Sequence, residues 1–378
     1  MSLISEVPPV SRVPREQPRV PVVSMNHVPL MPTTPAHARK MLKDGVARPR
    51  RNKLGIFYIQ MRIPVGSVTQ PMIVTDDVGG RHEGLAVASH RQVELTAQLE
   101  LPVGIPKKMA DRSDLRHARR FRHCPRRPQR FNNRRHHRRY WLAPTQAAKV
   151  HARVKAVQQL CAIFPITAIL VEDVRHTPRG KNDQHFTTAE VGKKLTYQEF
   201  RTLAPLTLVR GKDTAAWRDA LGLTKIGGPH RPPVFASQAV DAVAIAMGVS
   251  GCAFGHPPFF VWTAIRFVRR SLHRQQFQRG GIRPIYGGTT NGAFFRKGDW
   301  VEVFQPRKRV TRRGWVTGLP TLRTPTVAVQ DATGKRFGQY PPHNVRLLAR
   351  ASGFSWRRGT PALLPTAKAE GFRAGSIC

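Results

Sequence analysis

Apolar positions recur in short runs separated by turn residues, and their spacing predicts a mixed α/β protein. Strands are expected at 72–75, 85–89 and 93–101, which together favour a three-stranded antiparallel meander. The segment 146–164 carries apolar residues at helical spacing and predicts an amphipathic helix. The continuous apolar run 166–171 that follows it is typical of a strand buried on both faces.

The chain beyond that buried strand divides into a helical part and a strand-rich part. Residues 175–195 are polar and loop-like, and helices are expected at 197–203, 213–221 and 236–249. From Asp299 the pattern changes to short strands separated by turns, at 300–304, 314–317, 327–330, 335–339 and 345–348. Five such strands in about fifty residues predict a small SH3-like β-barrel.

The N-terminal region combines an expected disordered start with a small basic module. Residues 1–20 are rich in Pro, Ser and Arg and have no hydrophobic period, so we expect disorder. A helix is expected at Pro35–Asp44, closed by Gly45, followed by a strand from Ile56 to Ile63. The basic edge of this module suits phosphate contacts, although a solvated basic surface would show the same pattern. Its candidate residues are Arg39, Lys40, Arg50 and Arg51.

The charge of the chain narrows the class of partner. There are 63 Lys and Arg against 22 Asp and Glu, a formal net charge of +41, which implies a polyanionic partner. No apolar run of about 18 residues and no signal-peptide pattern occurs, so nucleic acid is favoured over a membrane. The four cysteines lie far apart without a CxxC pair, which argues against a structural zinc site or disulfides and fits a reducing cytoplasm.

The segment 112–139 is the most basic part of the chain, with 12 Arg and a single acid, Asp114. Its first half favours a helix that Pro125 and Pro128 must end. A charge run is usually a solvated or disordered face, but here it lies between two apolar blocks. We therefore interpret it as an arginine helix inside a nucleic-acid channel. Its candidate residues are Arg112, Arg116, Arg119, Arg120, Arg122, Arg126, Arg127, Arg130, Arg134 and Arg135.

Three acids are placed where a nuclease would need them. Asp77 ends the first strand of the meander, Glu172 ends the buried strand, and Asp241 lies near the start of an apolar helix. Carboxylates that converge from strand ends and a helix provide the hard oxygen ligands of a two-Mg²⁺ phosphodiesterase site. The order of meander, helix, strand and helix with acids at these points favours an RNase H-like fold.

Several blocks also resemble the IscB and IsrB proteins, and together they cover roughly residues 22–350. The block 22–51, with Pro29-Leu30-Met31-Pro32, looks like the PLMP domain of these proteins, and the arginine segment resembles their bridge helix. Three further blocks are similar to the three RuvC motifs: Asp77-Val78-Gly79-Gly80 followed by Gly84-Leu85-Ala86, Val171-Glu172-Asp173 and Ala239-Val240-Asp241-Ala242. Val78 and Gly80 replace the usual Pro and Ser of the first motif.

IscB proteins carry an HNH domain between the second and third RuvC motifs. Only 68 residues separate Glu172 from Asp241, and the histidines among them, His176, His185 and His230, lack an HNH context. The segment 192–223 instead looks like the linker of the HNH-lacking IsrB proteins. The resemblance to IsrB implies an omega-RNA-guided RuvC nickase that cuts the displaced, non-target strand of double-stranded DNA beside an adjacent motif. It also implies a monomeric ribonucleoprotein in a bacterial cytoplasm, dependent on Mg²⁺, for which Mn²⁺ can substitute.

The resemblance predicts a domain order along the chain. It gives a disordered start at 1–20, a PLMP domain at 21–65, RuvC part I at 66–108, the bridge helix at 109–142, RuvC parts II and III without HNH at 143–255, a basic linker at 256–298, an SH3-like barrel that interacts with the target-adjacent motif at 299–350, and a disordered tail at 351–378. His273, Arg274 and Arg283 are expected to assist in reading that motif.

One departure concerns Gln238, three residues before Asp241, where the family usually has His. That spacing puts both residues on one helix face, but Gln can orient a water without taking its proton. We expect slower cleavage rather than none, and a catalytically inactive guided binder stays open. A guide-free, structure-specific RuvC nuclease also stays open. A ribosomal-type RNA-binding protein would require the three acids to be a coincidence.

Overall fold

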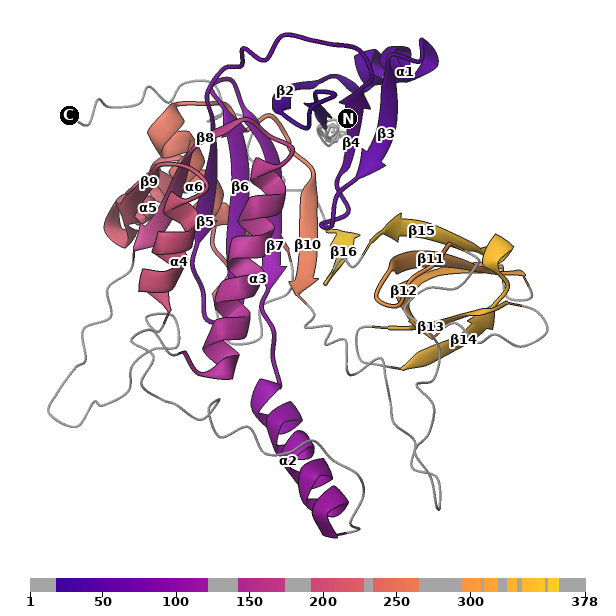
Figure 1. The fold of residues 1–378 in the computed structure, drawn as a ribbon. Helices are drawn as coiled ribbons and strands as arrows, with labels where there is room; N and C mark the ends of the chain where they lie inside the picture. The colour runs from indigo at the N-terminus through magenta and orange to yellow at the C-terminus, as the bar shows by residue number, and fades with distance from the viewer. Residues whose placement is uncertain are drawn as a thin grey trace, which may run out of the picture.

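A computed structural model describes most of the chain as three β-sheets with flanking helices (Figure 1). It describes residues 18–121, 142–173, 192–227, 234–264, 294–306, 309–318, 325–331, 335–350 and 353–359. The predicted mixed α/β class is confirmed. No helix within these ranges is long and apolar enough to cross a membrane.

The N-terminal module is a four-stranded sheet with one helix. Its sheet has the order β2-β1-β4-β3, in which β1 and β4 are parallel and the other pairs antiparallel. The predicted helix is confirmed, and the hydroxyl of Thr34 caps it by accepting a hydrogen bond from the backbone of His37. The elements are β1 (Val20–Val23), β2 (Pro29–Thr33), α1 (Pro35–Lys43), β3 (Ala47–Arg51) and β4 (Phe57–Met61).

The central sheet has seven strands in the order β16-β10-β7-β6-β5-β8-β9. Strands β5, β6 and β7 form the predicted antiparallel meander, and β8 and β9 then add in parallel beside β5. The strands are β5 (Met72–Asp77), β6 (His82–Ser89), β7 (Val93–Glu100), β8 (Ile166–Asp173), β9 (Leu206–Arg210), β10 (Phe259–Ala264) and β16 (Phe354–Arg358).

Helices cover both faces of this sheet. Leu160 of α3 (Pro144–Cys161) and Phe200 of α4 (Lys193–Arg201) share a core with Val74 and Val87 of the sheet. On the other face, α6 (Ala239–Ser250) packs against β5 and β6, and α5 (Gly211–Ala220) packs on α6. The helices expected at 146–164, 197–203, 213–221 and 236–249 are therefore confirmed. The helix α2 (Ile105–Phe121) begins before the arginine segment and extends away from the sheet (Figure 1).

Two strands lie in segments that the sequence assigned differently. Residues 259–264 were expected to belong to a basic linker, but they form β10, which pairs in parallel with β7. Their almost wholly apolar sequence suits a strand buried on both faces. Residues 354–358 were expected to be disordered, but they form β16, which pairs with β10 and buries Phe354 against the core. Strands β3 and β9 were not predicted either, because both are short and end in arginine.

The last sheet has five antiparallel strands in the order β14-β13-β12-β11-β15, as the strand count at 300–348 predicted. Its core contains Val301, Val316 and Val329. The strands are β11 (Trp300–Gln305), β12 (Val310–Gly318), β13 (Val327–Gln330), β14 (Arg336–Tyr340) and β15 (Val345–Ala349). Closure into an SH3-like barrel stays a prediction.

Candidate active site

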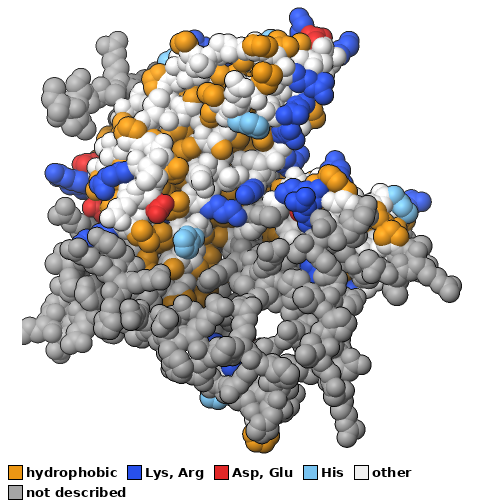
Figure 2. Space-filling view, viewed as in Figure 1, with side chains coloured by type: hydrophobic (Ala, Val, Ile, Leu, Met, Phe, Trp, Pro, Cys, Tyr) orange, Lys and Arg blue, Asp and Glu red, His pale blue; other side chains and the backbone are white. Residues whose placement is uncertain are grey.

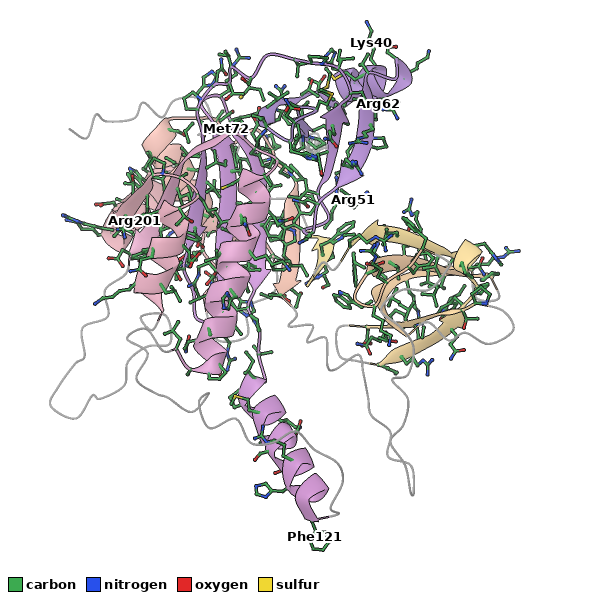
Figure 3. All side chains as sticks on the ribbon, in the orientation of Figure 1. Lys40, Arg51, Arg62, Met72, Phe121 and Arg201 are labelled. Carbon is green, nitrogen blue, oxygen red and sulfur yellow. The ribbon has the colours of Figure 1, made fainter. Side chains whose placement is uncertain are left out.

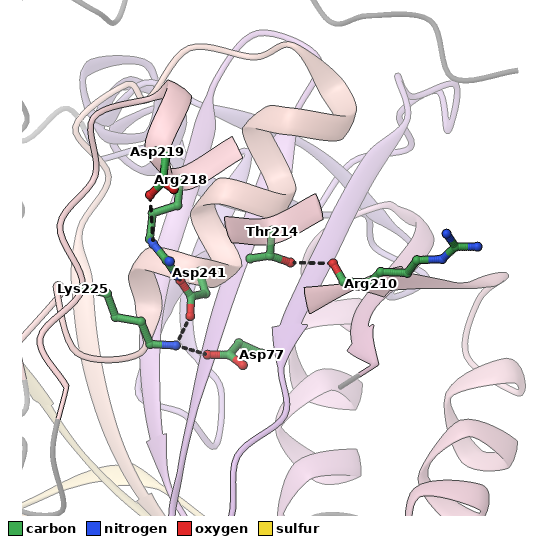
Figure 4. Close-up of polar contacts among 7 residues, drawn as sticks. All are labelled: Asp77, Arg210, Thr214, Arg218, Asp219, Lys225 and Asp241. Atoms are coloured by element: carbon green, nitrogen blue, oxygen red, sulfur yellow. Dashed lines mark hydrogen bonds and ion pairs between the residues drawn. The ribbon is translucent and has the colours of Figure 1, made fainter. Parts of the chain in front are cut away.

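Three acids predicted from the sequence converge at one end of the central sheet. Asp77 is the last residue of β5, and Glu172 lies on the parallel neighbour β8. Because Asp76 is in register with Val171, the next residues, Asp77 and Glu172, lie side by side. Asp241 belongs to the first turn of α6, which crosses the sheet at this point. The carboxyl ends of parallel strands and a helix start thus bring these side chains together, and Figure 4 shows two of them, Asp77 and Asp241.

A glycine lets α6 approach the sheet closely enough to join the site. Gly84 of β6 pairs with Asp77, and a Cβ atom at Gly84 would lie 2.2 Å from the carbonyl oxygen of Gln238. No other residue type leaves that space open. The hydroxyl of Thr75 on β5 fixes the same approach by donating a 2.7 Å hydrogen bond to the carbonyl of Ala242. The start of α6 is therefore held directly beside the end of β5.

The acids are buried and influence one another. Burial raises the pKa of Asp77 well above its usual value, and the adjacent carboxyl of Glu172, which shares a hydrogen bond with it, raises the pKa further. Asp241 acts in the same direction, while the ammonium of Lys225 opposes it. Burial and the two neighbouring carboxyl groups thus all disfavour the charged form of Asp77.

Two cations partly balance that charge. The Nζ atom of Lys225 donates a hydrogen bond to Asp241 and lies 4.0 Å from Asp77 Oδ2. The guanidinium of Arg218, from α5, donates to the other oxygen of Asp241 at 2.8 Å. Figure 4 shows Lys225 between the two carboxylates and Arg218 on the far side of Asp241. Lys225 therefore occupies the position where a cation is attracted by both acids.

The donor set suits a divalent metal ion, but the side chains are not arranged around one. Among the described residues, no group of three or more His, Cys, Asp or Glu side chains is spaced to hold a metal. The oxygens of Asp241 instead accept hydrogen bonds from Lys225 and Arg218. All three acids offer the hard oxygens that Mg²⁺ prefers, and the pKa of Asp77 shows that the cluster favours added positive charge. In this structure, cationic side chains occupy the oxygens of Asp241.

Gln238 lies at the edge of the acid cluster. It occupies the N-cap position of α6, one turn before Asp241, and its side chain makes no capping hydrogen bond. Its carbonyl oxygen accepts from the backbone N–H of Asp241 at 3.3 Å. The half-buried side chain therefore starts from the backbone that contacts Gly84, close to the acids.

Lys225 and Arg218 were missed as site residues by the sequence interpretation. Lys225 follows α5 in a loop, where no hydrophobic period indicates which way a side chain points. Arg218 lies on α5, but only the packing of Trp217 against Gly248 of α6 turns that helix toward Asp241. Both contacts depend on tertiary packing, and the sequence offers no local signal for them.

A second charged group lies nearby and is fully buried. Asp76 and Glu83 have no measurable exposure, and Arg153 of α3 forms an ion pair with Glu83. Arg153 also donates to the hydroxyl of Thr196 at 3.1 Å. Neither oxygen of Asp76 has a hydrogen-bond partner among the described residues. Burial, followed by repulsion from Glu83, raises the pKa of Asp76 well above its usual value, while Arg153 opposes the shift.

The predicted nucleic-acid-binding residues are only partly described. Arg39 and Lys40 on α1, Arg50 and Arg51 at the end of β3, and Arg116 on α2 are exposed. Figure 3 labels Lys40 and Arg51 among them. The backbones of three further arginines lie within α2, but their side chains fall outside the described residues: Arg112, Arg119 and Arg120. The remaining candidates lie wholly outside the described residues: Arg122, Arg126, Arg127, Arg130, Arg134, Arg135, His273, Arg274 and Arg283. His176, His185 and His230 also lie outside them.

Comparison with known proteins gives one family match and distant structural likenesses. Residues 20–191 match the model of the family described as RRXRR protein, a family found in IscB- and IsrB-like proteins. The solved structure of T. thermophilus RuvC in complex with a Holliday junction substrate is 14% identical, with a TM-score of 0.28, and the match covers 48% of this chain and 94% of that one. A Thermus thermophilus RuvC structure is 15% identical, with a TM-score of 0.24, and the match covers 47% and 93%. No curated protein matches the chain.

Proposed function

We propose that this chain is an RNA-guided DNA nickase of the IsrB type, with one RuvC-like nuclease centre on an RNase H-like core. The observation that carries the nuclease part is the convergence of Asp77, Glu172 and Asp241 from β5, β8 and α6. The order of the central sheet supports the RNase H-like assignment, since a three-stranded meander is followed by two parallel strands. Three carboxyl groups buried beside one another disfavour the charged form of Asp77, and such a costly arrangement favours a functional role over a structural one.

The three acids would hold the metal. Two Mg²⁺ ions at such a site supply stabilisation of the attacking and leaving oxygens during in-line displacement at phosphorus. Asp77, with its raised pKa, would release its shared proton on binding the metal. Gln238 would orient the attacking water, because its amide can donate and accept hydrogen bonds but cannot take a proton near neutral pH. Arg218 would keep Asp241 in place from the side away from Asp77.

The guided part of the proposal rests on charge and on the family match. A net charge of +41 is more than is needed to contact the few DNA phosphates around one nuclease site. A long structured omega RNA would balance the remaining positive charge. The match to the RRXRR family supports the same class. In this reading base pairing between guide RNA and target strand supplies sequence specificity, and the protein binds the backbone and a short duplex motif. The described residues bring together one acid cluster, and the resemblance to IsrB proteins implies that it nicks the displaced, non-target strand.

The test is to express the chain with its native flanking DNA and to sequence the RNA that co-purifies. A dominant long transcript from the flanking region is expected, and its guide then programs a supercoiled plasmid assay with Mg²⁺. Open circles without linear product are expected from the wild type, and neither product from Glu172→Gln. A random mixture of host RNA would contradict guidance, and full activity of Glu172→Gln would contradict the acid site.

Gln238 favours a second candidate, an RNA-guided DNA-binding protein that cuts slowly or not at all. A general base contributes about 10²- to 10⁴-fold to the rate, and Gln cannot serve as one. Gln238→His should then raise the nicking rate at pH 7.5 if the site is otherwise competent. A wild type that binds its guided target but gives no open circles, with or without Gln238→His, would establish the binding protein instead.

A further inference from the structure

Three parts of the fold meet at one tryptophan. Trp356 lies on β16 of the central sheet, with the guanidinium of Arg51 from β3 5.1 Å from its ring centroid. The guanidinium of Arg313, from β12 of the five-stranded sheet, lies 4.4 Å from the same ring. Gly55 makes room for this packing, since a Cβ atom there would lie 2.2 Å from the Trp356 ring. Trp356 thus orients one arginine from each neighbouring module, and Figure 3 shows Arg51 at this junction.

A pocket of about 520 Å³ opens beside this tryptophan. Its volume lies within the range of roughly 300–1,000 Å³ that is usual for ligand sites. Trp300, Arg313, Trp356 and Arg357 supply much of its wall. The indole N–H groups of Trp300 and Trp356 are buried, so the donors that the wall offers are the guanidinium groups of Arg313 and Arg357. Guanidinium donors suit a ligand rich in acceptor oxygens.

Positive charge at this junction exceeds negative charge. Glu302 is the one acid among the described residues that line the pocket, and it already accepts hydrogen bonds from Arg313 and Arg346. Although Arg51 is exposed overall, partial burial of its guanidinium lowers its pKa, and the nearby guanidinium groups of Arg313 and Arg346 lower it further. Mutual repulsion among guanidinium groups indicates that an anion would be stabilised here. Figure 2 shows Lys and Arg side chains gathered where the N-terminal module meets the last sheet.

We propose that this pocket binds a backbone phosphate of nucleic acid through Arg313 and Arg357, which line it. Guanidinium groups present N–H donors in a planar fork that matches two phosphate oxygens, and stacking on Trp356 fixes the orientation of Arg313. The phosphate would contact the central sheet and the last sheet at once, and the nearby guanidinium of Arg51 would add attraction from the N-terminal module. Nucleic acid would thereby strengthen the contact between these parts. RNA and DNA share this chemistry, so the test compares them.

The experiment measures binding of the full chain to two fluorescent probes, a single-stranded RNA and a DNA duplex of random sequence, by anisotropy at several salt concentrations. The variants are Arg357→Gln and Arg313→Gln. Arg357 is exposed and lines the pocket, so its replacement should leave the fold intact, whereas Arg313 also pairs with Glu302. The matched control is Arg201→Gln, which removes the same charge from an exposed arginine on α4, far from this junction (Figure 3).

We expect both variants to weaken binding by about fivefold and to reduce the slope of log K against log salt by about 0.7–0.9, the loss of one phosphate contact. The control should change neither value as much. A larger loss for the RNA probe than for the duplex would assign the phosphate to RNA, and the reverse would assign it to DNA. Affinities equal to those of Arg201→Gln would overturn the proposal, even if thermal unfolding shows that Arg313→Gln weakens the fold.

This proposal rests on the proposed function only in taking nucleic acid as the ligand. A wild type that binds neither probe would overturn both the pocket and the RNA-guided function. Normal wild-type binding that neither pocket variant reduces would overturn the pocket alone. Guided nicking by Arg357→Gln with a weaker affinity for the probes is the result that would support both.

Discussion

Two neighbouring residues, Asp76 and Asp77, lie on opposite faces of the central sheet and differ in how their charge is balanced. On the α3 face, Glu83 is paired with Arg153, whose side chain is 4% exposed, and Asp76 lies beside them without a hydrogen-bond partner among the described residues. On the α6 face, Asp77 and its two partner acids are balanced by Lys225 and Arg218, which are 29% and 22% exposed. Alternation along β5 separates these two acidic groups by a single peptide bond.

The difference separates a structural group from a functional one. A cation that is sealed in the core cannot leave without unfolding, so Arg153 makes its acids a permanent part of the packing. A cation at the surface can move into water at small cost, so Lys225 can leave its acids to another cation. Exposure of the compensating cation therefore indicates which acids are available for chemistry.

The largest expected effect is on the free energy of unfolding, and it comes from removing the buried guanidinium of Arg153. Arg153→Met leaves Glu83 buried without its ion pair, and the free energy of unfolding should fall by about 3–5 kcal/mol. Urea unfolding followed by circular dichroism measures it. Arg201→Met, at an exposed position, is the control and should cost less than about 0.5 kcal/mol. A loss below 1 kcal/mol for Arg153→Met would remove the distinction between the two faces.

The next effect concerns activity rather than stability. Asp77→Asn should lower the rate of Mg²⁺-dependent nicking by at least about 100-fold. Replacing a residue that only supports a metal ligand already lowers metal affinity or activity by about 10- to 100-fold, and Asp77 would be a ligand itself. The variant should be no less stable than the wild type without metal, since the raised pKa of Asp77 reflects an unfavourable charge. Mg²⁺ should raise the melting temperature of the wild type only. Asp219→Asn, an exposed acid beside Arg218, is the control. Equal stabilisation of Asp77→Asn by Mg²⁺ would contradict the assigned site.

The third effect depends on pH. The pKa of Asp76 is raised in the folded chain, so the wild type loses stability as pH rises above the ordinary value of about 3.9. Asp76→Asn removes that loss and should therefore be more stable than the wild type at pH 7. The gain should disappear below pH 4. Thermal melts from pH 3.5 to 8 test this, with the exposed Asp111→Asn as control. A gain that is constant with pH would show that Asp76 does not titrate as inferred.

The smallest effect concerns Lys225. Lys225→Met should lower metal-free stability by less than about 1 kcal/mol, because the ammonium is partly exposed. The variant should need less Mg²⁺ for half of the maximal rise in melting temperature, because the ion no longer competes with an ammonium. Lys212→Met, at an exposed position on α5, is the matched control. An unchanged or higher Mg²⁺ requirement would show that Lys225 does not compete for the metal position.

The sequence predicted the elements that have a long or continuous hydrophobic pattern. It missed strands that form only because a neighbouring strand pairs with them. The meander, α3, β8 and α6 were predicted because their apolar residues fill one face or both. Strand β10 was not, because its apolar run carries no sign that β7 would pair with it. Strand β16 was missed because its two terminal arginines, Arg357 and Arg358, look like a polar tail.

The candidate site shows the same division between local and tertiary signals. Asp77, Glu172 and Asp241 could be selected because acids are scarce in this chain and each ends or starts an apolar element. Their metal-ligand roles stay predictions. The sequence could not show that Lys225 reaches two of these acids, since a loop residue is positioned by the helices around it. Nor could it show that Asp76, one residue earlier, would be buried beside the ion pair of Glu83 and Arg153.

Strand β16 has a consequence for how the chain is made. The edge of β10 stays open until residues 354–358 have left the ribosome, so the central sheet is completed after the five-stranded sheet has been synthesised. An open strand edge is a template for pairing with other chains, and the finished edge is short and ends in two arginines, which discourage such pairing. A chain truncated before Phe354 would therefore expose the unpaired edge of β10. Premature termination should then lead to aggregation rather than to a shorter functional protein.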